Sequence, residues 1–136
     1  MFNNRKIARK KVFAPLTWVI DYIITKKRSL KINKKDIDGI KPPYIILCTH
    51  TSVLDYSVTS MVTFPNKVYN VCDKSDFVNH NFLMNTRNCI YEYRFMKNPE
   101  LIKDIKKTLK KGKIVALYPE VRYSADGTNS ELAPTL

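Results

Sequence analysis

The sequence contains little cysteine, and its cysteines are spaced unlike those of a metal or disulfide framework. The three residues, Cys48, Cys72 and Cys89, are odd in number and lack C-x-x-C spacing. All three lie in apolar runs, so we expect buried, reduced thiols and a cytosolic setting rather than disulfides or a zinc site. The chain also lacks an internal repeat and a low-complexity tract.

Acidic residues are scarce beside basic ones. The chain of 136 residues has 12 Asp and Glu against 24 Lys and Arg, for a formal net charge of +12. Such a surface favours anionic partners, namely nucleic acid, anionic lipid or phosphorylated substrates. A general abundance of lysine is the alternative explanation. With 44% hydrophobic and 26% charged residues, the composition predicts one globular domain with a true core rather than a disordered chain.

No apolar run reaches the roughly 20 residues that a helix needs to cross a bilayer. The longest candidate is "VFAPLTWVIDYII", residues 12–24, with basic residues on both sides. No small-residue cleavage site follows it, which argues against a signal peptide. We expect it to lie in the membrane interface, with Trp18 and Tyr22 at headgroup level and Pro15 kinking or splitting it. The alternative is a helix packed on the core of the protein.

This segment suggests a division of the chain into two parts. Residues 1–38 form the basic, amphipathic segment and a linker, and residues 39–136 form the main domain. The expected location is peripheral, on the cytoplasmic face of a membrane.

Apolar runs and helical patterns alternate along the rest of the chain. Four runs read as strands, at residues 42–49, 67–72, 88–93 and 113–120. Three segments between them read as helices, at residues 52–64, 75–87 and 98–112. This alternation predicts an α/β fold built on a largely parallel sheet.

Local signals refine these elements. The first run is continuously apolar, which predicts a buried strand. Ser52 and Asp55 fit a capping box at the start of the following helix. The helix over residues 98–112 begins with Asn98 and Pro99 and ends at Gly112. Its apolar positions predict one buried stripe, made of Leu101, Ile102, Ile105 and Leu109.

Polar residues follow three of the predicted strands. His50 comes after the first strand, Arg94 just after the third, and Glu120 at the end of the fourth. In an open α/β sheet, ligands bind beyond the carboxyl ends of the strands, so these side chains are expected at one edge. Each taken alone is an ordinary loop residue, and Asp55 alone is an ordinary capping acid. Their convergence favours a functional site.

Acyl transfer is chemistry that such a group can perform. A neutral imidazole is a suitable base at cellular pH, and a carboxylate on its other nitrogen fixes the tautomer and stabilises the imidazolium. We expect the His50 and Asp55 side chains to lie within hydrogen-bonding distance and to deprotonate a substrate hydroxyl. A Cys48–His50 nucleophile is the alternative, although a thiol within a strand is expected to be buried and inert.

Three blocks of the sequence resemble motifs of the glycerolipid acyltransferases, the 1-acylglycerol-3-phosphate acyltransferase group. Residues 50–55 match H-x-x-x-x-D directly after an apolar strand, and "CIYEYR", ending at Arg94, resembles the block G-x-x-F-x-x-R. "LYPEVRYSADG" resembles F-P-E-G-T-R-S, and fits better a branch of the family that reads P-E-A-R-Y-S. The resemblance covers about residues 40–130. In the last block the arginine of this chain, Arg122, lies one position before the arginine of F-P-E-G-T-R-S.

The resemblance implies a function and a role for each matched residue. The acyl donor would be acyl-CoA or acyl-carrier protein, and the acceptor a lysophosphatidic acid or glycerol phosphate. His50 would be the base and Asp55 its orienting partner. The acceptor would be held by Arg94, Glu120, Arg122 and Ser124. Neither a metal nor a cofactor is implied. The family also has a later, proline-bearing apolar strand, so we expect this chain to be an N-terminal fragment with one apolar edge of its sheet uncovered.

Two other classes of function remain open. A nucleic-acid-binding domain would use the basic charge, but the sequence offers neither stacking aromatics nor a recognition helix among its lysines. A non-catalytic, lipid-binding protein with an acyltransferase-like fold would keep membrane binding after loss of His50.

Overall fold

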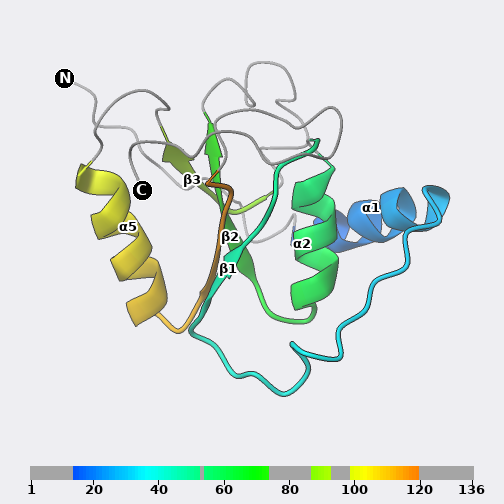
Figure 1. The fold of residues 1–136 in the computed structure, drawn as a ribbon, viewed down its shortest axis with the longest axis horizontal. Helices are drawn as coiled ribbons and strands as arrows, with labels where there is room; N and C mark the ends of the chain where they lie inside the picture. Colours follow the sequence, from blue (N-terminus) through cyan, green and yellow to red (C-terminus); the bar gives the residue numbers. More distant parts are fainter. Residues whose placement is uncertain (1–13, 53, 74–86, 93–98, 120–136) are drawn as a thin grey trace.

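The computed structural model describes residues 14–52, 54–73, 87–92 and 99–119. Within them the chain forms a sheet with helices on both faces (Figure 1). The elements follow in the order α1 (Ala14–Lys27), β1 (Ile45–Leu47), α2 (Asp55–Thr63), β2 (Val68–Asp73), β3 (Cys89–Glu92), α5 (Pro99–Lys110) and β4 (Ile114–Leu117). The predicted α/β fold is confirmed. Residues 75–86 of the helix expected over residues 75–87 lie outside the described residues.

Within the described residues the sheet has four strands in the order β1-β4-β2-β3, and every neighbouring pair is parallel. The last strand in sequence, β4, therefore lies between the first two. Because all four strands run in one direction, their carboxyl ends share one edge of the sheet, as the sequence predicts.

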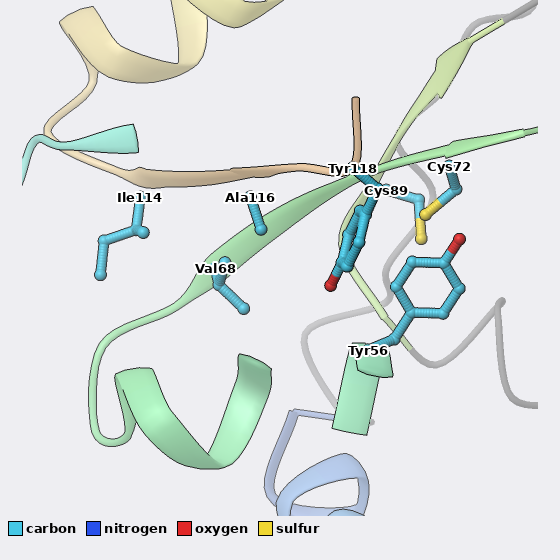
Figure 2. Close-up of a cluster of buried hydrophobic side chains, with 7 residues drawn as sticks. All are labelled: Tyr56, Val68, Cys72, Cys89, Ile114, Ala116 and Tyr118. Atoms are coloured by element: carbon cyan, nitrogen blue, oxygen red, sulfur yellow. The ribbon is translucent and has the colours of Figure 1, made fainter. Parts of the chain in front are cut away.

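The core has two layers, one on each face of the sheet. Alternate residues of β4 point to opposite faces, as strand geometry requires. Ile114, Ala116 and Tyr118 pack with Tyr56 of α2 on one face, where Figure 2 shows these side chains between α2 and the strands. The opposite face packs against α5 through Val115 and Leu117 of β4, together with Val71, Ile90, Leu101 and Ile105.

Helix α5 is stabilised at its end by a Schellman motif. Gly112 adopts a φ of +68°, which glycine reaches without steric cost. Its N–H donates to the carbonyl of Leu109 at 2.8 Å, and the N–H of Lys113 donates to the carbonyl of Thr108 at 3.3 Å. The predicted helix end is therefore confirmed.

The buried stripe predicted for α5 is wrong at one position. Leu101 and Ile105 are buried and Leu109 is half-buried, but Ile102 is 51% exposed. Thr108 is buried instead. Leu101, Ile105 and Thr108 are spaced four and three residues apart and so share one helix face, and Ile102 is rotated about 100° away from Leu101.

Among the described strands, β1 lies at the edge of the sheet, and the prediction that it is buried is also wrong. Ile45 and Leu47 are exposed, Leu47 at 70%, while Ile46 packs against the core on the α2 face. The cause is the strand order, since α5 packs on β3 and β4 and leaves the same face of β1 uncovered.

Helix α1 packs against α2 with its polar side inward. Thr17, Asp21 and Thr25, spaced four residues apart, are buried. The Asp21 carboxylate forms a buried ion pair with Arg87, whose guanidinium also donates to Ser57 Oγ at 2.7 Å. Burial raises the pKa of Asp21 and the nearby Arg87 charge opposes that rise. Pro15 lies in the first turn of α1, where proline is tolerated.

The outward side of α1 is apolar. Leu16, Val19, Tyr22 and Ile23 are exposed, each at between 44% and 55%. Trp18, which was expected at headgroup level, is half-buried and packs edge-on against Phe64 with ring centroids 5.2 Å apart. Helix α1 therefore packs on the protein, as in the alternative interpretation, while its apolar side faces outward. Its location in a membrane interface stays a prediction. Among the described residues, no helix is long and apolar enough to cross a membrane.

Candidate active site

His50 lies where the chain leaves the first strand. Pairing with β4 continues one residue past β1, because the N–H of Cys48 donates to the carbonyl of Leu117 at 2.9 Å. Two residues later, the side chain of His50 is completely buried. The imidazole is therefore positioned by the carboxyl end of a parallel strand, where ligand sites of α/β sheets occur.

Asp55 holds both the turn and the imidazole. Its Oδ2 lies 3.1 Å from His50 Nδ1 and accepts the backbone N–H groups of Thr51 at 2.7 Å and Ser52 at 2.9 Å. Thr51 Oγ1 adds a bond to Oδ1 at 3.2 Å. The predicted contact between His50 and Asp55 is confirmed. The same Asp55 carboxylate both stabilises the turn and contacts the His50 imidazole.

The predicted capping box is only half formed. Helix α2 begins at Asp55 with Leu54 at the N-cap, and no side chain caps it. Asp55 does reach back to the N–H of Ser52, but Ser52 Oγ accepts the N–H of Leu54 at 2.9 Å instead of that of Asp55. The helix starts three residues later than predicted because residues 50–52 form the turn around the carboxylate.

The electrostatic environment favours an ionised Asp55. Burial raises the pKa of this carboxyl group, but hydrogen bonds from His50, Ser52 and Thr51 outweigh that effect and leave the pKa below its ordinary value. A carboxylate without a proton can only accept, so His50 Nδ1 carries the hydrogen between them. In the neutral imidazole the lone pair then lies on Nε2, the nitrogen that can act as a base.

Two tyrosines enclose the other side of the imidazole. The hydroxyl of Tyr56 lies 3.4 Å from His50 Nε2. The ring of Tyr118 packs against the imidazole with centroids 4.7 Å apart, and the two tyrosine rings meet edge to face at 5.1 Å. Figure 2 shows these two rings beside one another at the end of the core cluster.

The hydroxyl of Tyr118 is engaged away from the imidazole. It lies 2.7 Å from Thr59 Oγ1 and donates to Asn70 Oδ1 at 3.1 Å. Burial raises the pKa of Tyr118 well above its ordinary value, so this phenol stays protonated. The network joins α2, β2 and the end of β4 beneath the imidazole and fixes the aromatic wall against which His50 packs.

Cys48 shares this environment but is a poor nucleophile. Its side chain is half-buried and packs on the α2 side of the core, and all three cysteines are free thiols. Burial raises the pKa of Cys48, and the nearby Asp55 charge adds to the rise. A protonated thiol is a weak nucleophile, so this burial argues against the alternative of a Cys48–His50 nucleophile. Cys72 and Cys89 are buried, as expected.

The predicted acceptor-binding residues Arg94, Glu120, Arg122 and Ser124 lie outside the described residues. The sheet order still bears on them. The strand that precedes Glu120, β4, is the direct neighbour of β1, whereas the strand that precedes Arg94, β3, lies three positions from β1. At about 4.8 Å between strands, β3 is about 14 Å from β1. The block that begins at Leu117 therefore starts beside the end of β1, and its second residue, Tyr118, packs against His50.

Neither Tyr56 nor Tyr118 was singled out by the sequence. A usable signal existed for Tyr118, which follows Ala116 by two residues and so must face the same side of the sheet as Ala116. Tyr56 directly follows Asp55, but only the observed start of α2 determines that its ring turns toward His50.

In the part of the chain that the structure describes, no group of three His, Cys, Asp or Glu residues is arranged to hold a metal ion.

The structure thus combines a parallel α/β sheet with a His–Asp contact at the carboxyl ends of its strands. The family model described as Acyltransferase matches residues 11–134, and the chain therefore belongs to the acyltransferase family. The resemblance to glycerolipid acyltransferases is confirmed at this level, and the protein is an acyltransferase enzyme. Searches of curated proteins and of solved structures returned no significant match.

The matched region begins before the expected domain boundary. It includes α1 and the linker as well as the sheet. The division of the chain at residues 38 and 39 stays a prediction.

Proposed function

We propose that this protein transfers a fatty acyl group from acyl-CoA or acyl-carrier protein to the hydroxyl of a lysophosphatidic acid or glycerol phosphate acceptor, in phospholipid biosynthesis. The observation that carries the proposal is the contact between His50 Nδ1 and Asp55 Oδ2 in a chain of the acyltransferase family. This contact leaves Nε2 as the basic nitrogen, which is what activation of a hydroxyl needs.

The reaction follows from that arrangement. His50 Nε2 takes the proton of the acceptor hydroxyl while the hydroxyl oxygen attacks the thioester carbonyl of the donor. The C–O ester bond forms, the C–S bond breaks, and the proton passes from the imidazolium to the departing thiolate. Asp55 stabilises the imidazolium between these two proton transfers, because its carboxylate is held ionised by the backbone of the turn.

The acceptor phosphate is assigned to Arg94 and Arg122, with Glu120 and Ser124 orienting an arginine or a glycerol hydroxyl. Arginine binds phosphate oxygens through paired donors, which suits this role. These assignments rest on the resemblance of the sequence blocks, and for the block that follows β4 also on the strand order.

The acceptor class is tested by comparing two acceptors that differ only in the phosphate. Full-length protein is assayed with labelled acyl-CoA or acyl-carrier protein, and with lysophosphatidic acid or the matching monoacylglycerol. We expect ester formation with the phosphorylated acceptor and a large loss without the phosphate. Arg94→Ala should raise KM for the phosphorylated acceptor far more than for the donor. Equal use of the two acceptors, or equal effects on both substrates, contradicts the assignment.

The protein is further proposed to bind the surface of an anionic membrane through α1. The outward side of this helix exposes Val19 and Ile23 at 54% and 55%, and its last turn carries Lys26 and Lys27. Exposed apolar side chains beside basic residues are the features of helices that lie in a membrane interface. Each basic residue near an anionic surface contributes on the order of 1 kcal/mol, less at high salt.

Vesicle flotation tests this binding with a matched control. Val19→Asp and Ile23→Asp are compared with Ile102→Asp, since Ile102 is exposed to a similar extent on α5, across the sheet from α1 (Figure 1). We expect salt-sensitive recovery with anionic vesicles, reduced by the two α1 variants and unchanged by Ile102→Asp. Equal recovery with neutral and anionic lipid, or equal loss in all three variants, rules the surface out.

A further inference from the structure

The basic nitrogen of His50 is already occupied in this structure. Nδ1 meets Asp55, and the hydroxyl of Tyr56 lies 3.4 Å from Nε2. Both His50 and Tyr56 are completely buried, so this contact is shielded from solvent. The proposed base is therefore held on both sides by the protein before any acceptor is bound.

The direction of these bonds follows from the ionised Asp55. Because the carboxylate accepts the hydrogen on Nδ1, Nε2 carries a lone pair and can only accept. The Tyr56 hydroxyl is then the donor. An acceptor hydroxyl must also donate to Nε2 in order to lose its proton, at about 2.6–3.2 Å. One lone pair in the plane of the ring accommodates one well-aligned donor, so the two hydroxyls compete for the same position.

We propose that Tyr56 is a resting-state occupant of the acceptor position, and that the acceptor hydroxyl replaces its hydroxyl on His50 Nε2. This inference rests on the proposed role of His50 as the base. It identifies Tyr56 as a residue that sets acceptor affinity, which neither the sequence blocks nor the family membership assigns.

The geometry suits a replaceable contact. A separation of 3.4 Å is longer than the usual 2.7–2.8 Å of an O–H donor, so the bond is weak. Rotation of the Tyr56 O–H about its C–O bond releases the lone pair while the ring stays packed edge-on against Tyr118. Because His50 and Tyr56 are completely buried, entry of the acceptor hydroxyl also requires the Tyr56 side chain to move aside.

Tyr118 is the matched control for Tyr56. Its ring also contacts the imidazole, but its hydroxyl is bound to Thr59 and Asn70 and does not reach Nε2. Tyr56→Phe and Tyr118→Phe each remove one buried hydroxyl from the same cluster. Only the first removes a donor from the basic nitrogen.

Kinetics of the full-length protein give the first test. Removing the competing donor in Tyr56→Phe should lower KM for the acceptor by about 2- to 3-fold, the low end of the range that one net hydrogen bond supplies. KM for the acyl donor should not change. If kcat instead falls by about 100-fold or more while KM for the acceptor is unchanged, the proposal is overturned, because Tyr56 would then carry the proton itself.

Nitrogen NMR gives a second test that needs no turnover. The chain has two histidines, and His80→Asn leaves only the His50 signals in protein labelled with ¹⁵N-histidine. We expect the Nε2 resonance to move downfield in Tyr56→Phe, toward that of an unprotonated nitrogen without a donor, and to stay in place in Tyr118→Phe. No movement in Tyr56→Phe, or equal movement in both variants, overturns the proposal.

Two controls separate the possible failures. Tyr56→Met, whose flexible thioether fills space without donating, replaces Tyr56→Phe in both tests if the latter does not fold. If His50→Ala keeps acyl transfer, the proposed base is wrong whatever Tyr56 does. Because the NMR test reports the contact at Nε2 without substrate, it still decides whether Tyr56 occupies that nitrogen.

Discussion

Asp55→Asn tests the negative charge of Asp55 in the proposed His50–Asp55 pair. All three nitrogen donors, from His50, Thr51 and Ser52, approach the same oxygen, Oδ2. An asparagine that places its carbonyl oxygen there keeps these bonds, and its amide group then faces Thr51 Oγ1. The tautomer of His50 is therefore preserved and only the charge is lost.

The expected size of the effect follows from the distance. A unit negative charge 3.1 Å from an imidazolium, at an effective dielectric constant of about 20, contributes about 5 kcal/mol. The proton is only partly transferred in the transition state, and the asparagine dipole keeps part of the attraction. About 3–4 kcal/mol should then be lost, so that kcat falls by about 100- to 1,000-fold.

The assay is steady-state acyl transfer by full-length protein with the acceptor varied. We expect kcat to fall as stated and KM for the acceptor to change little, because the charge acts on the imidazolium and not on the acceptor. Asp38→Asn, which removes an exposed carboxylate in the linker, is the matched control and should behave as the unmodified protein. A loss below about 3-fold in Asp55→Asn, where 3-fold is only about 0.7 kcal/mol, would refute the reasoning.

Burial and charge lead to three further predictions. The pKa of Asp55 is lower in the folded than in the unfolded protein, so the Asp55 carboxylate stabilises the fold above about pH 4. This stabilisation is lost as the pH falls through the folded pKa. Urea titrations should therefore show that the difference in free energy of unfolding between the unmodified protein and Asp55→Asn becomes smaller in acid. Ile105→Ala should lower the free energy of unfolding by about 2–4 kcal/mol and Ile102→Ala by less than about 1 kcal/mol, and equal effects would contradict the packing of α5. Cys48→Ala should keep most acyl transfer, whereas abolished turnover in a folded variant would restore the thiol as nucleophile.

The parts of the fold that depend on local pattern could be predicted from the sequence. The end of α5 at Gly112 follows from backbone chemistry alone, and the shared carboxyl edge follows from the alternation of strands and helices. The His50–Asp55 contact was also predictable, since a strand-to-helix turn brings positions five apart together. Each of these depends on residues that are close in sequence or on one topological rule.

The parts that depend on strand order could not be predicted. The exposure of Leu47 arises because β1 is at the edge and α5 covers other strands. The exposure of Ile102 depends on which face of α5 meets the sheet. The inward polar side of α1 depends on Arg87, which is distant in sequence and pairs with Asp21. The roles of Arg94, Glu120, Arg122 and Ser124 stay predictions.

The central claim is that His50 is the base of an acyl transfer reaction. The most direct measurement compares ester formation by full-length His50→Ala with that of the unmodified protein, using saturating acyl-CoA and lysophosphatidic acid, after circular dichroism has established that both are folded. We expect the folded variant to lose acyl transfer while its binding to anionic vesicles is unchanged. Turnover by folded His50→Ala close to that of the unmodified protein would contradict it.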